Sequence, residues 1–363
     1  MKHVARITVK TKFEQYDVLI GSGLEYGKLA RKVKEPCKVV IISDDNVFPL
    51  YGDAATSSFR ENGYQTSHFI IKSGEASKTL ATLSKLLEFL ATKSITRQDL
   101  LVALGGGVVG DITGFASAIY LRGMKYLQLP TTILAAVDSS VGGKTGVDLP
   151  AGKNLVGAFH QPAGVFCDTN VFTTLPKDAY SGGMAEVIKH GMIADKELLS
   201  LLCGKEHSIE KSPIFEQLTL VDICRRNVAI KAGIVEQDEF DTGVRMLLNF
   251  GHTVGHAVEV VSRYQISHGS AVAIGMMVET RASEKSGLTG SPCSDYLEMV
   301  LNRYRLPTCC DYSAKELANA ALKDKKRLGE TIALITPKEI GSAEIYHLPV
   351  TQLENFIAKG LNK

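Results

Sequence analysis

The sequence predicts an α/β domain with a doubly wound, Rossmann-like sheet, followed by a mostly α-helical domain. The first half alternates short apolar runs with helical patterns, whereas long helical patterns dominate from about residue 178. At 363 residues the chain is also longer than one ordinary hydrophobic core. We therefore expect two domains, one over residues 1–170 and the other over residues 171–363.

Several segments of the first half have the patterns of strands and of a helix that covers them. Arg6–Lys10 alternates apolar and polar residues like an edge strand, and Tyr16–Ile20 has the pattern of its partner. Cys37–Ser43 and Asp99–Leu104 are continuous apolar runs, as expected for strands buried on both faces of a parallel sheet. The leucines of Lys78–Lys93 recur on one stripe, which indicates an amphipathic helix.

The second half is predicted to be helical, with a short β-hairpin near its end. Apolar residues recur there with helical periodicity over long windows, and only two late segments have strand character. The predicted helices are Tyr180–Cys203, Phe215–Val235, Met246–Arg263, His268–Lys285 and Asp295–Tyr304; the strands Thr331–Ile335 and Ala343–Tyr346 and a helix from Thr351 follow.

Composition limits the classes of function. The formal net charge is only +2, which excludes a general polyanion binder, and the absence of tryptophan argues against a base-stacking surface. The cysteines are odd in number and form no C-x-x-C pair, which favours reduced thiols. No secretory signal or membrane-spanning run is evident. We expect a soluble cytoplasmic protein with neither a nucleic-acid nor a membrane partner.

A glycine-rich turn is the first candidate for a binding site. Residues 105–111 read GGGVVGD and match G-x-G-x-x-G, after a buried strand and before a helical stretch. Glycines there let backbone N–H groups approach a pyrophosphate. The acidic residue that a standard fingerprint carries about twenty positions later is replaced by Pro130. Asp44, at the end of an earlier strand, is a better candidate for binding a ribose, and Glu75 and Lys78 can reach a cofactor from a preceding loop.

The segment 130–154 is a candidate binding loop for an anion. It is dense in small and hydroxyl side chains and carries Lys144, Lys153 and Asn154. Glycine lets the chain come close to an anion while lysine supplies a point charge. GGKT within it is not a P-loop, because Asp138 stands where the leading glycine is required. Arg122, in YLRG, could add a bidentate contact to phosphate.

Histidines and a glutamate in the second half are candidates for metal ligands. His252 and His256 lie four apart on a predicted helix and so share a face, and His268 opens the next helix. Glu186 and Lys189 lie one turn apart in a third helix with apolar or glycine neighbours, which makes Glu186 a plausible third ligand. Spacing alone leaves open whether His252 and His256 pair, or whether His268 replaces one of them.

Taken together, these blocks resemble the 3-dehydroquinate synthases of the sugar-phosphate cyclase superfamily. The resemblance runs from Asp44 to the DKK at 324–326, nearly the whole chain. The matching blocks are SGEASKT, GGGVVGDITGF, YLRG, PTT, VDSSVGGKTGV, GKN, GGMAEVIK, DEFDTGVR, LNFGHTVGHAVE and SHGSAVAIGM. Among the departures, Asp148 stands where asparagine is common, Asp241 where glutamate is common, and Ser270 where glutamate is usual.

The resemblance implies a lyase that uses NAD and one divalent ion, zinc or cobalt. It would convert 3-deoxy-D-arabino-heptulosonate 7-phosphate to 3-dehydroquinate and phosphate in the shikimate pathway, which leads to chorismate and the aromatic amino acids. It also implies a homodimer in which Arg122 reaches across the interface. Alternatives are another sugar-phosphate cyclase such as a 2-deoxy-scyllo-inosose synthase, a metal-dependent glycerol dehydrogenase, or a non-catalytic regulator descended from the enzyme.

The resemblance also assigns residues. Metal ligands fall on Glu186, His252 and His268, so that His256 becomes a phosphate contact. Substrate contacts or catalytic groups fall on Arg122, Asp138, Lys144, Asn154, Lys189, Lys231, Arg245, Asn249, His256, Lys325 and Lys326. Cofactor contacts fall on Asp44, Ser73, Gly74, Glu75, Ala76, Ser77, Lys78, Gly107, Val108, Val109, Gly110, Asp111, Thr131, Thr132, Lys144, Lys153, Val171, Phe172, Thr173 and Thr174.

Overall fold

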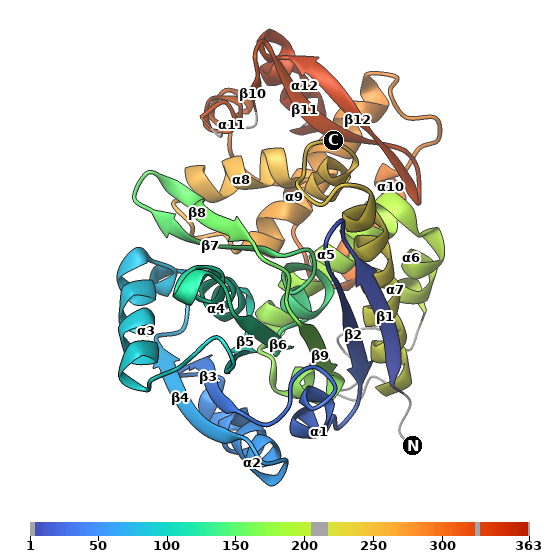
Figure 1. The fold of residues 1–363 in the computed structure, drawn as a ribbon. Coiled ribbons are helices and arrows are strands. Elements are labelled where there is room, and N and C mark those ends of the chain that lie inside the picture. The colour runs from blue at the N-terminus through green and yellow to red at the C-terminus, as the bar shows by residue number, and fades with distance from the viewer. Residues whose placement is uncertain (1–3, 205–216, 324–326, 362–363) are drawn as a thin grey trace. The chain divides into compact units, whose positions relative to one another are not determined.

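The computed structural model describes residues 4–204, 217–323 and 327–361 (Figure 1). Its contacts divide the chain into two compact units. The first comprises Met1–Leu175 and Glu216–Glu236, and the second comprises Pro176–Phe215 and Gln237–Lys363. The single boundary that we drew at residue 170 did not foresee that a later segment, helix α7 (Gln217–Gln237), is grouped with the first unit.

A mixed, mostly parallel sheet forms the centre of the first unit. Within the described residues its strand order is β1-β2-β9-β6-β5-β3-β4. β1 pairs with β2 in antiparallel orientation at the edge, as predicted, and the other neighbours are parallel. The strands are β1 (Ala5–Lys10), β2 (Gln15–Gly21), β3 (Lys38–Asp44), β4 (Gln65–Ile71), β5 (Leu100–Gly105), β6 (Lys125–Pro130) and β9 (Gly164–Asp168).

Helices cover both faces of this sheet, which confirms the predicted doubly wound α/β fold. Alternate residues of β3 face opposite sides, and both sides are fully buried, which explains the continuous apolar run. Val39 and Ile41 pack with α1 (Tyr26–Ala30) and α2 (Asp53–Glu61). Val40 and Ile42 pack in the cluster that contains α3 (Leu80–Thr92) and α4 (Gly107–Ile119).

The predicted binding loop over 130–154 is largely ordered structure instead of a loop. A turn of π-helix (Ala135–Ser139) is followed by a two-stranded antiparallel sheet, β7 (Lys144–Leu149) and β8 (Gly152–Phe159). The hairpin packs on α4, in Figure 1 beside the label of that helix. A glycine of α4 permits that approach, because a Cβ on Gly114 would lie 2.4 Å from Cγ2 of Thr145.

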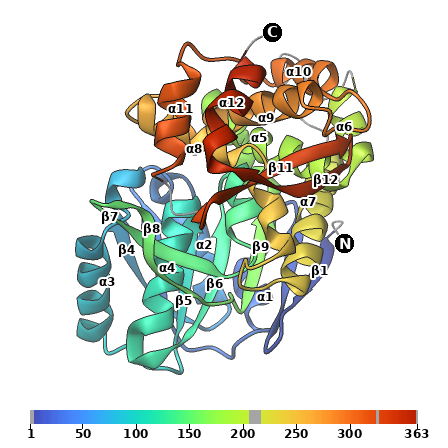
Figure 2. The ribbon, with the colours of Figure 1, turned by 90° about the horizontal axis from the view of Figure 1, so that it is seen from above.

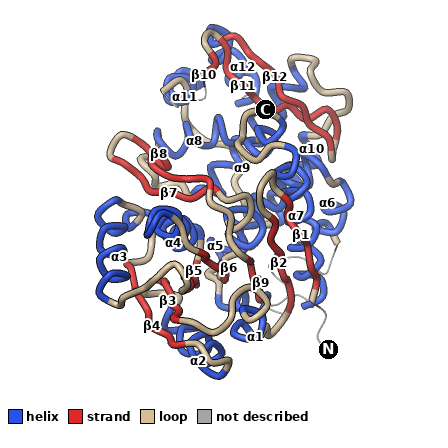
Figure 3. Tube along the Cα trace, viewed as in Figure 1, coloured by secondary structure: helices blue, strands red, loops and turns tan. Residues whose placement is uncertain are grey.

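The second unit is mostly helical (Figures 2 and 3). Its core joins α8, α9, α11 and α12 with the hairpin β11–β12. The elements are α5 (Lys177–Ala194), α6 (Lys196–Cys203), α8 (His252–Val261), α9 (His268–Lys285), α10 (Ser294–Arg303), α11 (Ala314–Ala321), α12 (Leu353–Leu361), β10 (Arg327–Leu328), β11 (Thr331–Glu339) and β12 (Ser342–Pro349).

Short helical turns complete the described chain. They comprise the π-helical turn Phe48–Gly52 and the 3₁₀ helices Glu75–Ser77, Tyr120–Arg122, Thr169–Thr174, Val244–Asn249 and Val350–Gln352. None of the helices in the described ranges is long and apolar enough to span a membrane.

Two of the predicted helices are each divided in the structure. Tyr180–Cys203 breaks at Asp195, whose carboxylate accepts the N–H groups of Glu197 and Leu198 at 3.0 Å and so caps a new helix. Met246–Arg263 breaks at Gly251, which adopts a left-handed φ of 76° before α8 begins. Both breaks depend on local interactions and backbone angles, which the hydrophobic periodicity of a sequence does not reveal.

Candidate active site

In the first unit, the predicted cofactor residues gather at one edge of the parallel sheet. Parallel strands present their carboxyl ends on the same side, and ligands of open α/β sheets bind there. Asp44 ends β3, the glycine turn follows β5, Thr131 and Thr132 follow β6, and the segment 171–174 follows β9. The structure therefore brings together the cofactor residues that the sequence assigned separately.

The glycine turn is built by close contacts at two of its positions. A Cβ on Gly105 would lie 2.6 Å from Cγ2 of Val109, and one on Gly110 would lie 2.6 Å from Oε1 of Gln128. The N–H group of Thr131 donates to the carbonyl of Gly105 at 3.0 Å, which links β5 to β6 just beyond the sheet. Helix α4 begins at Gly107, so its first N–H groups face the edge where the other cofactor residues lie.

Lys78 connects three segments of this unit. Its ammonium pairs with Asp111 of α4 at 2.5 Å and donates to Oδ1 of Asn154 at 2.6 Å. Glu75 and the rest of the segment 73–78 lie in the 3₁₀ turn and its flanks just before. Burial lowers the pKa of Lys78, but the charges of Asp111, Glu75 and Asp148 outweigh that effect and raise it above its usual value. Lys78 is therefore an ammonium at neutral pH.

The other cations predicted for the first unit occupy distinct positions. Lys144 is the exposed first residue of β7, and Lys153 lies on β8. Lys231 of α7 pairs with the carboxylate of Asp138. Arg122 has a left-handed φ of 66° in a 3₁₀ turn. Lys325 and Lys326 lie outside the described residues.

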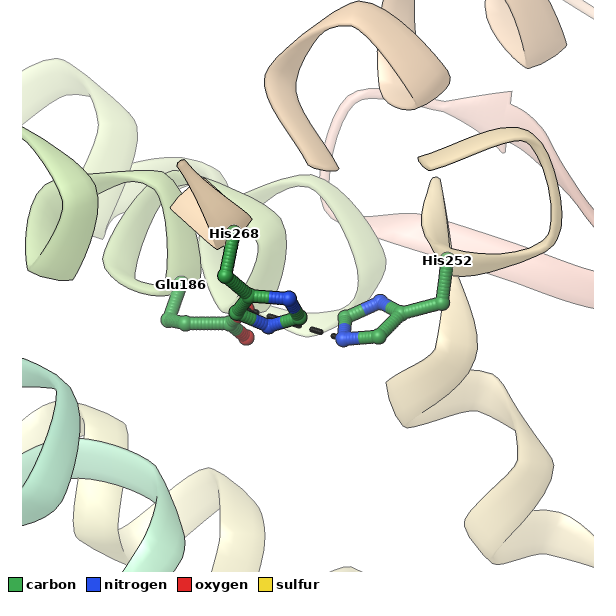
Figure 4. Close-up of side chains that lie close together, drawn as sticks. All are labelled: Glu186, His252 and His268. Carbon is green, nitrogen blue, oxygen red and sulfur yellow. Dashed lines mark ion pairs between the residues drawn. The ribbon is translucent and has the colours of Figure 1, made fainter. Parts of the chain in front are cut away.

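In the second unit, Glu186 of α5, His252 of α8 and His268 of α9 converge on one point. Figure 4 shows the side chains pointing toward one another. Nε2 of His252 and Nε2 of His268 each lie 3.6 Å from Oε1 of Glu186. One ligand atom from each residue lies within 4.8 Å of the others. Of the arrangements that spacing left open, this group is the one in which His268 accompanies His252.

This donor set fits a divalent metal ion. Ligand atoms about 2 Å from one tetrahedral ion lie about 3.4 Å from each other, close to the observed separations. A carboxylate with two imidazoles is also the ligand chemistry of catalytic zinc sites, which keep a further position for water or substrate. A second group, His256, Glu259 and His268, shares one histidine with the first.

Glycines allow the helices of the cluster to approach. A Cβ on Gly269 would lie 2.3 Å from Cα of Gly182, so α5 and α9 touch backbone to backbone one residue after His268. A Cβ on Gly275 would lie 1.9 Å from the carbonyl oxygen of Gly251, which holds α9 equally close to the start of α8. The glycines of the GGM, FGHTVGH and SHG blocks therefore let the helices that carry the proposed ligands pack closely.

The electrostatics of the cluster favour a charged His268. Burial lowers its pKa, but hydrogen bonds and charges from Glu186 and Glu259 outweigh burial and raise the pKa to about 9. Nδ1 of His268 lies 3.5 Å from Oε2 of Glu259, a buried carboxylate of α8. Sequence reasoning missed Glu259, although it lies two helical turns after His252 and thus on nearly the same face.

Four further predicted residues belong to the second unit, and two of them lie beside this cluster. Lys189 is buried and pairs with Glu186 one turn away. The His256 ring lies 5.4 Å from that of His252. Arg245, also buried, and Asn249 belong to the 3₁₀ helix Val244–Asn249.

Comparisons with known proteins identify the family of this chain. The 3-dehydroquinate synthase N-terminal family model matches residues 68–182, and the C-terminal family model matches residues 183–327. A 3-dehydroquinate synthase of Streptococcus suis is 40% identical over 356 residues, which cover 97% of this chain and 99% of that protein.

Two solved structures share the fold. A 2-deoxy-scyllo-inosose synthase, complexed with carbaglucose-6-phosphate, NAD⁺ and Co²⁺, has a TM-score of 0.87 at 23% identity and covers 98% of this chain and 100% of its own. A 2-epi-5-epi-valiolone synthase from Streptomyces hygroscopicus subsp. jinggangensis 5008, with NAD⁺ and Zn²⁺ bound, has a TM-score of 0.87 at 23% identity and covers 98% and 99%. The identity at full length and the matched domains decide the family: this chain belongs to the 3-dehydroquinate synthases.

Proposed function

We propose that this protein converts 3-deoxy-D-arabino-heptulosonate 7-phosphate to 3-dehydroquinate and phosphate, the second step of the shikimate pathway. The observation that carries the proposal is the convergence of Glu186, His252 and His268 in a chain that belongs to this family. The gathering of the glycine turn with Asp44 and Thr131 at one sheet edge supports a dinucleotide cofactor.

NAD and one divalent ion, zinc or cobalt, are the proposed cofactors. A bound NAD⁺ would supply reversible hydride transfer at the C5 carbon of the substrate, so that the cofactor would not be consumed. A divalent ion supplies charge that polarises an oxygen of the substrate. Glu186, His252 and His268 would hold the ion, and Asp44, Lys78, Asp111 and the glycine turn would bind and orient the dinucleotide.

Lys144, Asn154, Arg122, Asn249 and His256 are proposed to bind the phosphate of the substrate. Cations and amide donors that face a leaving phosphate stabilise the negative charge that develops as its bond to carbon breaks. The leaving phosphate itself would take the neighbouring proton, so that the protein needs no dedicated strong base. Asp138, Lys189, Lys231, Arg245 and one of Lys325 and Lys326 are proposed to hold the rest of the substrate.

An assay of products separates this function from its alternatives. The purified protein, loaded with metal, is incubated with the heptulosonate phosphate and a catalytic amount of NAD⁺. The proposal expects one free phosphate for each dehydroquinate and no accumulation of NADH. A dehydrogenase would accumulate NADH without releasing phosphate, and a non-catalytic regulator would release neither product. Conversion of glucose 6-phosphate but not of the heptulosonate would instead identify an inosose synthase.

A homodimer is also proposed, formed through a surface around Arg122. Ile119 and Leu121 next to it are each 42% exposed, and Phe159 is 43% exposed. His160, the neighbour of Phe159, bonds Ser117 at 2.9 Å, so these residues belong to adjoining segments. Apolar side chains that flank a strained, exposed arginine suit an interface through which that arginine reaches a partner's substrate. The cytoplasm is the proposed compartment, in keeping with the free cysteines of the described chain.

A further inference from the structure

The hairpin β7–β8 holds Asn154 in an uncommon backbone conformation. Its φ is 54°, in the left-handed region, which asparagine adopts more readily than most residues other than glycine. The hairpin is irregular just there, because its register shifts between Val147 and Leu149. Asn154 is exposed, whereas Lys78, which it contacts, is only 4% exposed. An exposed polar side chain that its neighbours hold in one backbone conformation is a candidate for a functional position.

Asp148 supports this conformation through the backbone. Its Oδ1 accepts the N–H group of Asn154 at 2.7 Å. Its own N–H group donates to the carbonyl of Lys78 at 2.8 Å, and a parallel bridge joins it to Thr79. Asp148 therefore connects Asn154 to the segment that carries Lys78, with one hydrogen bond on each side.

The contact with Lys78 fixes which end of the Asn154 side chain faces outward. An ammonium has only hydrogens to give, so the carboxamide must turn its oxygen toward Nζ of Lys78, at 2.6 Å. The NH₂ group then lies on the other side and has two hydrogens for an acceptor. Asp111 pairs with the same ammonium and keeps it in place. The exposed end of Asn154 is thus a hydrogen-bond donor, which suits an oxyanion.

We infer that Asp148 is a positioning residue that acts through Asn154: it and Lys78 aim the Asn154 NH₂ group at a phosphate oxygen of the substrate. This inference rests on the proposed function, in which Asn154 is a phosphate contact. An asparagine side chain at position 148 would offer the same carbonyl-type oxygen to the N–H group of residue 154. The required feature is an acceptor at this place, and not a negative charge.

A double-mutant cycle tests the inference in the protein loaded with NAD⁺ and metal. The variants are D148A, N154G and the double variant; glycine removes the carboxamide and fits the left-handed backbone without strain. The readouts are kcat/KM for the heptulosonate phosphate and the inhibition constant of inorganic phosphate. Loss of one hydrogen bond to a charged group corresponds to about tenfold in either quantity, so N154G is expected to lose about that factor.

If Asp148 acts only through Asn154, the effects of D148A and N154G on the two readouts should not add. The double variant should match N154G within about twofold, because Asp148 has nothing left to position. D148N keeps the accepting oxygen and should restore phosphate inhibition close to that of the wild type. The control D195A also removes a carboxylate that accepts backbone N–H groups, but at the start of α6, and should leave both readouts unchanged.

Failure of the inference and failure of the proposed function have different results. If N154G leaves phosphate inhibition unchanged, Asn154 is not a phosphate contact and the inference falls with that assignment. If N154G weakens phosphate binding but D148A does not, or if the two losses multiply in the double variant, the positioning role is wrong while the contact stands. If the wild type forms no dehydroquinate, the proposed function itself is wrong.

Discussion

Glu186, His252 and His268 form the proposed metal cluster. In each of its two histidines, the ring nitrogen that faces away from Glu186 has a partner of its own. Nδ1 of His252 lies 3.2 Å from the carbonyl oxygen of Phe250, and Nδ1 of His268 lies 3.5 Å from the carboxylate of Glu259. A carbonyl can only accept, so Nδ1 of His252 carries the hydrogen and Nε2 is left as the ligand atom. The same ring orientation in His268 follows from Glu259.

Glu259 should therefore matter for metal affinity, although it is not one of the proposed ligands. We expect E259Q to weaken zinc binding by about 10-fold to 100-fold, the range found for partners that orient ligating histidines. Titration with zinc against a competing chelator measures the constant. E298Q is the control, because Glu298 pairs with Arg281 at 3.0 Å elsewhere in the same unit. Equal zinc affinities of E259Q and the wild type would show that Glu259 does not contribute to metal binding.

At the scale of elements, the metal cluster depends on how closely three helices approach. Glu186, His252 and His268 come from α5, α8 and α9, and glycines lie at both crossings. At Gly269 the obstacle to a larger side chain is backbone, which cannot rotate away as a side chain would. The distance between Glu186 and His268 therefore depends on the absence of a methyl group at Gly269.

We expect G269A to destabilise the metal-free protein by about 1–3 kcal/mol and to weaken metal binding, because α5 and α9 must separate. G233A is the matched control: nothing lies within 4 Å of a Cβ at Gly233 in helix α7. Alanine there should stabilise the helix by about 0.5–1 kcal/mol. Urea unfolding measures both changes. A G269A variant as stable as the wild type, with unchanged metal affinity, would show that the crossing tolerates a methyl group.

Periodicity predicted the elements better than it predicted their ends or contacts. It identified β3 and β5 because both faces of those strands are buried. It missed the hairpin β7–β8, in which Gly146 and Gly157 let the two strands approach and do not form a loop. The helix breaks at Asp195 and Gly251 depend on a side-chain cap and a left-handed residue, which a hydrophobic pattern does not contain.

The candidate site, too, was predicted from the sequence only in part. Spacing along one helix could bring His252 and His256 to the same face, but the choice of His268 depends on how α8 packs on α9. Glu259 and Asp148 were missed because each acts on a neighbour in the fold, and single carboxylates carry no motif. The resemblance to the family supplied the ligand set, and the geometry of the second unit agrees with it.

At the scale of the whole molecule, the proposed catalytic residues are distributed over both compact units. Nucleotide-binding residues and Lys144 belong to the first, and the metal cluster with Arg245 belongs to the second. The proposed dimer adds Arg122 from a partner. We therefore expect activity to require a dimer in which both units of each chain are folded.

A charge in the proposed interface tests this dependence. We expect L121D to be largely monomeric and to lose most of its activity; aspartate tolerates the left-handed φ of 51° at this position better than leucine. Sedimentation equilibrium gives the mass, and the phosphate assay gives the activity. F13D is the control, since Phe13 is 77% exposed and not part of the surface around Arg122. Full activity of a monomeric wild type would exclude a catalytic role of the dimer.

In the proposed mechanism, catalysis depends most on a single ion held by Glu186, His252 and His268. The most direct measurement removes all metal from the protein with EDTA, adds zinc or cobalt in steps, and records phosphate release with the metal bound per chain. We predict no turnover without metal, with activity rising in proportion and reaching its limit at one ion per chain; H268A should neither bind that ion tightly nor recover. Full activity in verified metal-free protein, or undiminished binding by H268A, would contradict the account.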